Sequence, residues 1–439
     1  MEIVLLVKGK IPSSEPIVNI GMVLPNDKLK KIKISFSNNS LFDFYFNEKK
    51  STIDDNELNI EVIDNKLFYN KTDTSSIKIN TNASNLEDYI LIDSLPVGRG
   101  FHWANKIPVK VLGNIIIMIK ENNLFVVNQL KLEHYIMCVS TSEMSSECPT
   151  DLLKSQTIAA RSWVLAASEQ KHRELNIDAC NDDCCQRYQG INNLTKHSIA
   201  SAESTRGKVL IFFNEICDAR YSKSCGGLTE DNNNVWETGE KKYLQSIVDS
   251  DTISRPLISN AIGLKSWFLS SPDCYCSPKM VPESQLHKFL GAVDQNKSYF
   301  RWSISITQSD LINNIKKQTD IDFEYILSLV PLKIGSSSRI MTLKIEGSQD
   351  GKRKSLMLNS EYDIRKVLHY DFLFSSAFLI QTEFENNIYP SLFHLKGAGW
   401  GHGVGMCQIG ALGMSLNGKT YLEILNHYFP STHLHTLYG

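Results

Sequence analysis

The sequence changes character at Leu132-Glu-His-Tyr-Ile-Met-Cys-Val-Ser-Thr-Ser-Glu143, where the spacing of its apolar residues becomes helical. Leu132, Ile136, Val139 and Glu143 are separated by four, three and four positions, so they share one helix face. A carboxylate that continues an apolar face points into the interior or into a cleft. The spacing leaves two readings of Glu143 open: a functional carboxylate, or a helix-end residue tied to a backbone group or an arginine.

A second helix is expected to begin soon after this one. Pro149 suits a first-turn position, and Asp151 is favourable at the positive end of a helix. Helical spacing then continues to about Lys171. Glu147 precedes this helix, so we read it as a residue that favours the helix start rather than as a second catalytic carboxylate.

Strands are expected before and after these helices. Runs rich in β-branched and apolar residues, separated by Asn and Asp clusters, predict strands at 17–24, 31–36, 58–63, 109–119, 124–128, within 207–225, at 339–347 and in two further pieces up to about 385. A helix is expected around 309–318, and another in the tail, where Thr420 and Glu423 form a capping box and Pro430 ends the helix. The pattern predicts an α+β fold with largely antiparallel strands and a few helices lining a cleft.

Composition limits the classes of function. The chain has 439 residues, of which 42% are hydrophobic and 21% charged, as in ordinary globular proteins, and its net charge is -2. This charge gives no electrostatic argument for a nucleic-acid or anionic-lipid partner. No apolar run approaches the roughly 20 residues needed to span a bilayer. The start, Met1 to Lys8, lacks the basic region and cleavage site of a signal peptide.

Three motifs carry the functional argument. They are Thr141-Ser-Glu-Met-Ser-Ser-Glu-Cys-Pro149, Ala219-Arg-Tyr-Ser-Lys-Ser-Cys-Gly-Gly-Leu-Thr229 and Gly397-Ala-Gly-Trp-Gly-His-Gly-Val-Gly-Met-Cys-Gln-Ile-Gly-Ala411. Together they resemble the SpoIID/LytB family of bacterial cell-wall proteins, which includes stage II sporulation protein D and the amidase enhancers. The resemblance extends to the segments 338–347 and 365–378. It divides the chain into a β-rich start of the fold at 1–128, a catalytic core at 129–254, an accessory insertion at 255–338 and a C-terminal β region at 339–439 that completes the core.

The resemblance implies that Glu143 is the catalytic residue of a peptidoglycan lytic transglycosylase. Such enzymes cut MurNAc–GlcNAc strands, here those stripped of stem peptides, and leave 1,6-anhydroMurNAc ends. One carboxyl suffices because the C6 hydroxyl of the substrate attacks the anomeric carbon, whereas ordinary glycosidases need two. The carboxyl must be protonated at rest, which a partly apolar wall favours. Two positions depart from the family pattern: Ser145 replaces a common proline and Cys407 a common serine.

The motifs also suggest binding residues. The glycines between 397 and 405 allow positive φ angles and close approach of the backbone to a ligand. Trp400 could stack on a sugar, and His402 and Gln408 could hydrogen-bond to it, although a buried glycine-rich turn is the alternative. The predicted substrate-binding residues in the second motif are Tyr221, Ser222, Ser224, Gly226 and Gly227, with plain turn structure as the alternative. The predicted supporting residues are Gln156 and Arg161. The two supporting residues could orient Glu143, or could instead serve as surface or core-anchoring residues.

The ten cysteines are too sparse for a disulfide scaffold, but some of them cluster. His172, Cys180, Cys184 and Cys185 offer ligands of the type that zinc takes, and some relatives carry zinc beside the corresponding segment. Adjacent Cys184 and Cys185 strain such a site, so a disulfide or free thiols stay open. Cys274 and Cys276 could join either arrangement. Isolated cysteines such as Cys138 and Cys407 are most simply small core residues.

The leading hypothesis is therefore a lytic transglycosylase that needs no cofactor for its chemistry, with a structural zinc as a further expectation. The runner-up is a protein that binds glycan strands and stimulates a cell-wall N-acetylmuramoyl-L-alanine amidase without cutting. A zinc hydrolase is disfavoured because the sequence contains no H-E-x-x-H motif. The expected partners are peptidoglycan strands and an amidase. The expected location is the cell envelope, the periplasm or the extracellular space.

Overall fold

The computed structural model has two compact units. The described residues are 4–69, 72–81, 85–101, 103–291, 298–385 and 389–438. Unit 1 comprises Met1–Asp218, Phe289–Val293 and Leu434–Gly439, and unit 2 comprises Ala219–Lys288 and Asp294–His433. The units cut across the four segments expected from the sequence, because the boundary after Asp218 falls inside 129–254 and the last residues return to unit 1.

Two sheets form the β-rich part of unit 1. Among the described residues the first has seven strands in the order β13-β1-β12-β11-β8-β3-β4. They are β1 (Ile17–Val23), β3 (Phe42–Phe46), β4 (Lys49–Ser51), β8 (Ile77–Thr81), β11 (Asn114–Lys120), β12 (Asn123–Lys131) and β13 (Ala179–Cys180). Apart from the parallel pair β1–β13, its neighbouring strands are antiparallel.

The second sheet, as far as the chain is described, has six strands in the order β10-β9-β2-β5-β6-β7. They are β2 (Lys31–Phe36), β5 (Glu57–Ile63), β6 (Lys66–Tyr69), β7 (Thr72–Thr74), β9 (Ile90–Val97) and β10 (Asn105–Val111). The two sheets contact each other through β1 and β9, β12 and β5, and β11 and β6. Buried and exposed positions alternate in β2 and β5, so these strands have one face in the core.

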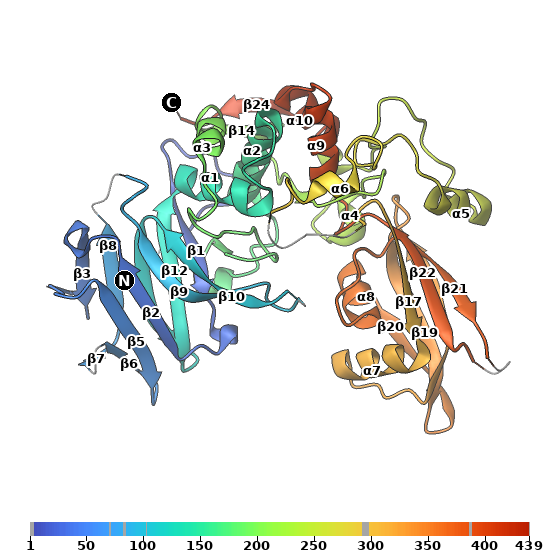
Figure 1. Cartoon of the computed structure of the whole chain (residues 1–439), viewed down its shortest axis with the longest axis horizontal. Coiled ribbons are helices and arrows are strands. Elements are labelled where there is room, and N and C mark those ends of the chain that lie inside the picture. Colours follow the sequence, from blue (N-terminus) through green and yellow to red (C-terminus); the bar gives the residue numbers. More distant parts are fainter. Residues whose placement is uncertain are drawn as a thin grey trace. The chain divides into compact units, whose positions relative to one another are not determined.

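Helices adjoin the first sheet. They are α1 (Leu132–Glu143), α2 (Thr150–Ala166) and α3 (Lys196–Glu203), which pack on one another beside the strands (Figure 1). The helix α1 contacts β1 and β12, and β1 is buried on both faces after its first residue. Ile177 and Cys180 pack against Ile116, Phe125 and Val127 of the same sheet. A small sheet in the order β15-β14-β24 completes this part, with β14 (Lys208–Phe212), β15 (Glu215–Ile216) and β24 (His433–Thr436). Short 3-10 helices lie at Pro25–Asp27, Asn39–Leu41 and Arg173–Leu175.

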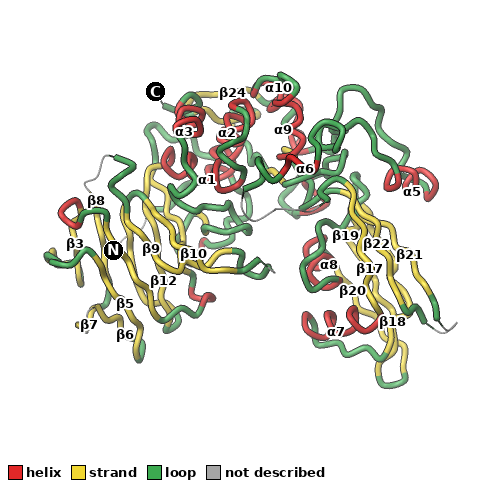
Figure 2. The backbone as a smooth tube through the Cα atoms, in the orientation of Figure 1, coloured by secondary structure: helices red, strands yellow, loops and turns green. Residues whose placement is uncertain are grey.

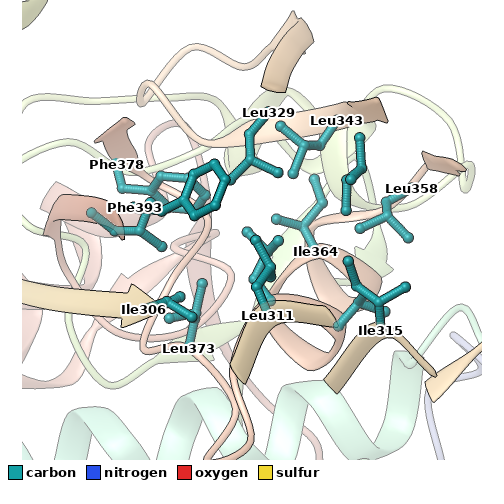
Figure 3. Packing of buried hydrophobic residues seen from close by; sticks show 14 of the residues in the cluster. Ile306, Leu311, Ile315, Leu329, Leu343, Leu358, Ile364, Leu373, Phe378 and Phe393 are labelled. Carbon is teal, nitrogen blue, oxygen red and sulfur yellow. The ribbon is translucent and has the colours of Figure 1, made fainter. Parts of the chain in front are cut away.

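Unit 2 is built around two antiparallel three-stranded sheets with the orders β17-β22-β21 and β18-β19-β20 (Figure 2). The strands are β17 (Arg301–Thr307), β18 (Tyr325–Ile334), β19 (Ile340–Gln349), β20 (Lys352–Leu358), β21 (Phe378–Glu383) and β22 (Leu392–Ala398). The helices α7 (Gln308–Gln318) and α8 (Glu361–Leu368) pack on them. Their apolar faces form one core with the strands, in which Leu311, Ile364 and Phe393 meet (Figure 3).

The rest of unit 2 joins distant stretches of the chain. The strand β16 (Tyr221–Ser222) pairs in parallel with β23 (Met406–Cys407). The remaining elements are α4 (Asn232–Val235), a 3-10 helix at Lys242–Leu244, α5 (Ala261–Leu269), α6 (Glu283–Leu286), α9 (Gln408–Leu416) and α10 (Tyr421–Tyr428). The Thr420 capping box is confirmed, and α10 ends just before Pro430. None of the described helices is long and apolar enough to cross a membrane.

The structure confirms the α+β class with largely antiparallel strands, and it corrects several boundaries. The run 109–119 is two strands, because Gly113 takes φ +82 and a Cβ there would lie 2.3 Å from a backbone oxygen. Pro149 precedes α2 rather than lying in its first turn. The helix ends at Ala166 instead of near Lys171, because Ser168 turns away and bonds through its amide and hydroxyl to Asp218. The helix α8 was missed.

Candidate functional site

Glu143 is the last residue of α1 and lies at the edge of the interior of unit 1. The predicted helix face is confirmed, because Leu132, Ile136 and Val139 are fully buried and Glu143 is 9% exposed. One carboxylate oxygen of Glu143 accepts a hydrogen bond from the backbone amide of Arg187 at 2.9 Å. The carboxyl is therefore held by a backbone group from a segment far along the chain.

The segment that holds Glu143 follows the cysteine cluster. The amide of Gln189 donates to the Ser142 hydroxyl at 3.0 Å, beside the Glu143 contact. The Tyr135 hydroxyl donates to the Gln186 side chain at 3.0 Å, and Gln186 in turn donates to the carbonyl of Ala160 in α2 at 3.2 Å. Helix α1 is thus bonded to residues 186–189 at Tyr135, near its start, and at Ser142 and Glu143, at its C-terminal end.

Charged and aromatic side chains that the sequence reading did not single out surround this segment. The Arg187 side chain forms an ion pair with Asp183, and the indole nitrogen of Trp103 donates to Asp183 at 3.2 Å. Trp103 also stacks on Phe101, with ring centroids 4.3 Å apart. Burial raises the pKa of Asp183 to about 6, although the Arg187 charge opposes the shift. A usable signal existed, since Trp103 lies in the Gly- and aromatic-rich run that starts at Gly98.

The predicted supporting residues of α2 are both fully buried. Arg161 donates two hydrogen bonds to the carboxylate of Glu133, at 2.9 and 2.6 Å, and one to the carbonyl of Lys208. Glu133 is the second residue of α1, at the opposite end from Glu143. The geometry therefore agrees with the core-anchoring role of Arg161 and not with a surface position or with orientation of Glu143. The role of Gln156 stays a prediction.

The structure brings the four predicted metal ligands of unit 1 together. One ligand atom from each of His172, Cys180, Cys184 and Cys185 lies within 4.8 Å of the others. The Cys184 sulfur is 3.0 Å from that of Cys180 and 3.4 Å from the His172 ring nitrogen. The adjacent cysteines both reach this cluster, so their adjacency does not exclude a shared ion. Hydrogen bonds from the other two thiols lower the pKa of the Cys184 thiol, which favours the thiolate that binds metals.

In unit 2, the structure joins the second and third motifs. Besides the β16–β23 pair, Ser224 and Trp400 exchange backbone hydrogen bonds of 3.1 and 2.8 Å. Gly226 and Gly227 take φ +73 and +102, and a Cβ at Gly226 would lie 2.7 Å from the Gly399 nitrogen. Gly226 is therefore required by the close approach of the two motifs to each other, whereas a Cβ at Gly227 would meet Cys274 and Trp267.

The glycine-rich loop of the third motif wraps around a buried arginine. The φ angles of Gly399, Gly401, Gly403 and Gly405 are positive, as expected. The guanidinium of Arg339, which is fully buried, donates to the Gly401 carbonyl at 3.1 Å. A Cβ at Gly403 would lie 2.4 Å from the central guanidinium carbon. The loop thus closely approaches a side chain of its own unit.

The three predicted sugar-binding side chains of this motif are mostly engaged within unit 2. Trp400 is 9% exposed and stacks on both Tyr299 and Phe374, at centroid distances of 5.0 and 4.8 Å. His402 packs edge-on against Trp236, and Gln408 is 1% exposed. Their binding roles, like those of Tyr221, Ser222 and Ser224, stay predictions. Glu143 belongs to the other unit, so the predicted cleft is likewise not tested.

Unit 2 contains one further candidate for ligand binding. A pocket of about 820 Å³ is lined by aromatic and polar side chains that include Trp302, Phe374, His369, Asp371 and Lys396. Such a mixture of rings and hydrogen-bonding groups is the kind of lining that sugar ligands use.

Comparisons with known proteins assign the two parts of the chain differently. Residues 120–212 match the Stage II sporulation protein family, and residues 230–405 match a domain of unknown function (DUF8618). An uncharacterized protein of Brachyspira hyodysenteriae (strain ATCC 49526 / WA1) is 24% identical over 321 residues, which cover 73% of this chain and 71% of that protein.

Two relatives from Bacillus subtilis (strain 168) have informative names. Stage II sporulation protein D is 24% identical over 325 residues, which cover 70% of this chain and 75% of that protein. The amidase enhancer is 24% identical over 310 residues, which cover 67% of this chain and 39% of that protein. The match over residues 120–212 contains Glu143 and the first cysteine cluster, and the relatives bear the names of both branches, so the comparisons support the resemblance of the chain to the SpoIID/LytB family.

Proposed function

We propose that the protein is a lytic transglycosylase that cleaves MurNAc–GlcNAc strands of peptidoglycan, with Glu143 as its single acid–base residue. The observation that carries the proposal is the position of Glu143. It ends a buried helix within the family-matched segment, it is 9% exposed, and a backbone amide holds its carboxyl. Because peptidoglycan lies outside the cytoplasm, we place this activity in the cell envelope.

The chemistry needs one carboxyl in two protonation states. Glu143 gives its proton to the glycosidic oxygen as the bond to the MurNAc anomeric carbon breaks. The C6 hydroxyl of the same sugar attacks that carbon, and the carboxylate takes the hydroxyl proton, which restores the acid and closes the 1,6-anhydro ring. The Arg187 amide, which donates to the carboxyl at 2.9 Å, keeps it in one orientation during this cycle.

The residues around Glu143 have supporting roles in this proposal. The Arg187 amide fixes the orientation of the carboxyl, and the Arg187–Asp183 ion pair fixes the segment that carries this amide. Trp103 offers an aromatic ring beside the same pair, so we propose it as a sugar-stacking residue. We expect Trp103→Ala to weaken strand binding without loss of the fold.

A zinc ion fits the first cysteine cluster in this proposal. Three thiols and one imidazole with ligand atoms within 4.8 Å match the number and type of ligands in a closed structural zinc site. A bound ion would fix the loop that runs from Cys180 to Gln189, and with it the amide that holds Glu143. The ion itself takes no part in the proposed bond cleavage.

The experiment compares two glutamates that are four positions apart. Glu143→Gln and Glu147→Gln make the same change from a carboxyl to an amide, but Glu147 is exposed. Purified wild-type protein is incubated with amidase-treated glycan strands, and anhydro-ended products are counted by mass spectrometry. We expect Glu143→Gln to lower the cleavage rate by about 10²- to 10⁴-fold, and Glu147→Gln to leave it unchanged. Products that persist in Glu143→Gln would refute the residue assignment.

A second function is favoured by the name of one relative, the amidase enhancer. In that reading the protein binds strands, in part through the pocket of unit 2, and stimulates an amidase without cutting. Wild-type protein that binds strands, yields no anhydro ends and accelerates a cell-wall amidase would establish it and overturn the transglycosylase. In that case Asp371→Ala, at the pocket, should weaken strand binding, and Glu143→Gln should not.

A further inference from the structure

Unit 2 contains a second group of metal-ligand side chains, which lies outside the site described above. Ligand atoms of Cys225, Asp249, Cys276 and Cys407 all lie within 4.8 Å of one another, and all four residues are buried, with exposures of 3%, 0%, 3% and 0%. The sequence predicted that Cys407 is an isolated core cysteine, and this prediction is wrong, because Cys407 belongs to the cluster. Three thiols and a carboxyl converge where an apolar core would place hydrocarbon side chains.

We propose that Cys225, Asp249, Cys276 and Cys407 form a closed zinc site that holds together four segments of unit 2. The donor set consists of ligand types that zinc takes, and four protein ligands leave no open position, as in structural sites. Carboxylate with thiolates suits zinc better than the hard cations magnesium and calcium, which prefer oxygen ligands alone. This proposal is independent of the glycan chemistry.

The distances suit one ion rather than a disulfide or a larger cluster. With zinc–sulfur bonds of about 2.3 Å and tetrahedral angles, two ligand sulfurs lie about 3.8 Å apart. The sulfurs of Cys225 and Cys276 are 3.7 Å apart. Disulfide sulfurs would lie about 2.05 Å apart, and any such bond would leave the third thiol buried beside it.

Backbone amides already orient the sulfurs. The amides of Cys225 and Gly410 donate to the Cys407 sulfur at 3.2 and 3.3 Å, and the amide of Gly227 donates to the Cys225 sulfur at 3.3 Å. Amide donors stabilise thiolates, and hydrogen bonds to ligand atoms are the usual second layer of a metal site.

The carboxylate has a similar second layer. Asp249 accepts hydrogen bonds from the Cys276 amide at 3.0 Å and from the Tyr428 hydroxyl. The ring nitrogen Nε2 of His427 lies 3.9 Å from an Asp249 oxygen and has no hydrogen-bond partner among the described residues. Asp249 is thus fixed in orientation, with a histidine beside it.

The location explains what a bound ion would do. Cys225 follows β16, Cys407 ends β23 and caps α9, and Asp249 and Cys276 come from the loops between α4 and α6. The ion would tie the second and third sequence motifs to these loops. It would also fix the glycine-rich loop that precedes Cys407.

The test measures metal content in the full-length protein purified from zinc-supplemented medium. Cys276→Ser is compared with Cys274→Ser, a buried cysteine two positions away that is not in the cluster. We expect Cys276→Ser to lower the zinc content by one equivalent per chain and Cys274→Ser to leave it unchanged. Equal zinc content in Cys276→Ser and the wild type would overturn the proposal.

A second measurement does not depend on whether Cys276→Ser folds. In the double variant Cys184→Ser, Cys185→Ser the first cluster is disabled, so X-ray absorption at the zinc edge reads the ligands of the remaining ion. We expect three sulfurs and one oxygen or nitrogen. No bound zinc in this variant, or a disulfide between any two of Cys225, Cys276 and Cys407 found by non-reducing peptide mapping, would overturn the proposal.

Discussion

Among the described residues, each unit has one fully buried arginine, and the two arginines are stabilised in different ways. Arg161 in unit 1 faces an opposite charge, since its guanidinium group donates to both carboxylate oxygens of Glu133 at 2.9 and 2.6 Å. Arg339 in unit 2 faces neutral acceptors: the Gly401 carbonyl at 3.1 Å, the Ser337 hydroxyl at 2.9 Å and the Cys225 carbonyl at 3.5 Å.

The directions of the pKa shifts in the two units follow from this difference. Burial lowers the pKa of the Arg339 guanidinium, and the opposing charge of Glu230, which is linked to it through the Ser337 hydroxyl, does not outweigh this shift. Burial also opposes ionisation of Glu133, but the charge and hydrogen bonds of Arg161 outweigh it and lower the pKa of Glu133. The buried arginine of unit 1 is therefore stabilised by a charge partner. The buried arginine of unit 2 is stabilised by the shape of the glycine-rich loop around its guanidinium.

The largest effect is expected from removal of the charge partner. Glu133→Gln leaves Arg161 buried without a counter-charge, and breaking a buried pair in this way typically costs about 3–5 kcal/mol. We expect this loss in the free energy of unfolding of unit 1, read from hydrogen exchange of the amides of α1 and α2. Glu57→Gln removes the partner of Lys33 in an exposed pair and serves as the control, with no measurable loss expected. Equal exchange in the two variants would refute the dependence on charge.

The next effect tests the dependence on shape. Gly403→Ala puts a Cβ 2.4 Å from the Arg339 guanidinium carbon, at φ +77, so overpacking and backbone strain together should cost about 2–4 kcal/mol. Gly418→Ala, at φ +81 with nothing within 4 Å, carries the strain alone and should cost about 1 kcal/mol. Urea unfolding of both variants gives the difference. If the two variants lose the same free energy of unfolding, the loop tolerates the added Cβ, and the shape of the loop does not stabilise the buried Arg339.

The two arginines also mark where the sequence was informative. Helical spacing correctly located α1, because its buried apolar face repeats with a local period. The predicted positive φ angles are found at Gly399, Gly401, Gly403 and Gly405. Spacing does not specify which side chain an arginine meets, so the pairing of Arg161 with Glu133 was not predicted. The Cys225 cluster was missed for the same reason, since its ligands are spread over four segments. The first cluster was found because its ligands lie close together in the chain.

A smaller effect should appear on acidification. Because the pKa of Glu133 is lower in the folded protein than its ordinary value of 4.5, the pair contributes stability above that pH, and this contribution is lost as the pH falls through the folded value. We expect the stability of unit 1 to decrease below about pH 4.5 in the wild type. In Glu133→Gln this part of the change of stability with pH should be absent. If the stability of the variant falls with pH as steeply as that of the wild type, other carboxylates cause the acid sensitivity.

The smallest effect concerns a neutral partner of the same carboxylate. The Tyr438 hydroxyl donates to Glu133 at 2.7 Å, so Tyr438→Phe removes one hydrogen bond while Arg161 and the Gly207 amide keep theirs. We expect a loss of about 1 kcal/mol, seen as faster amide exchange in β24. Tyr370→Phe, at a residue 72% exposed, is the control and should change nothing. A loss as large as that of Glu133→Gln would mean that the hydroxyl, and not the ion pair, anchors the end of the chain.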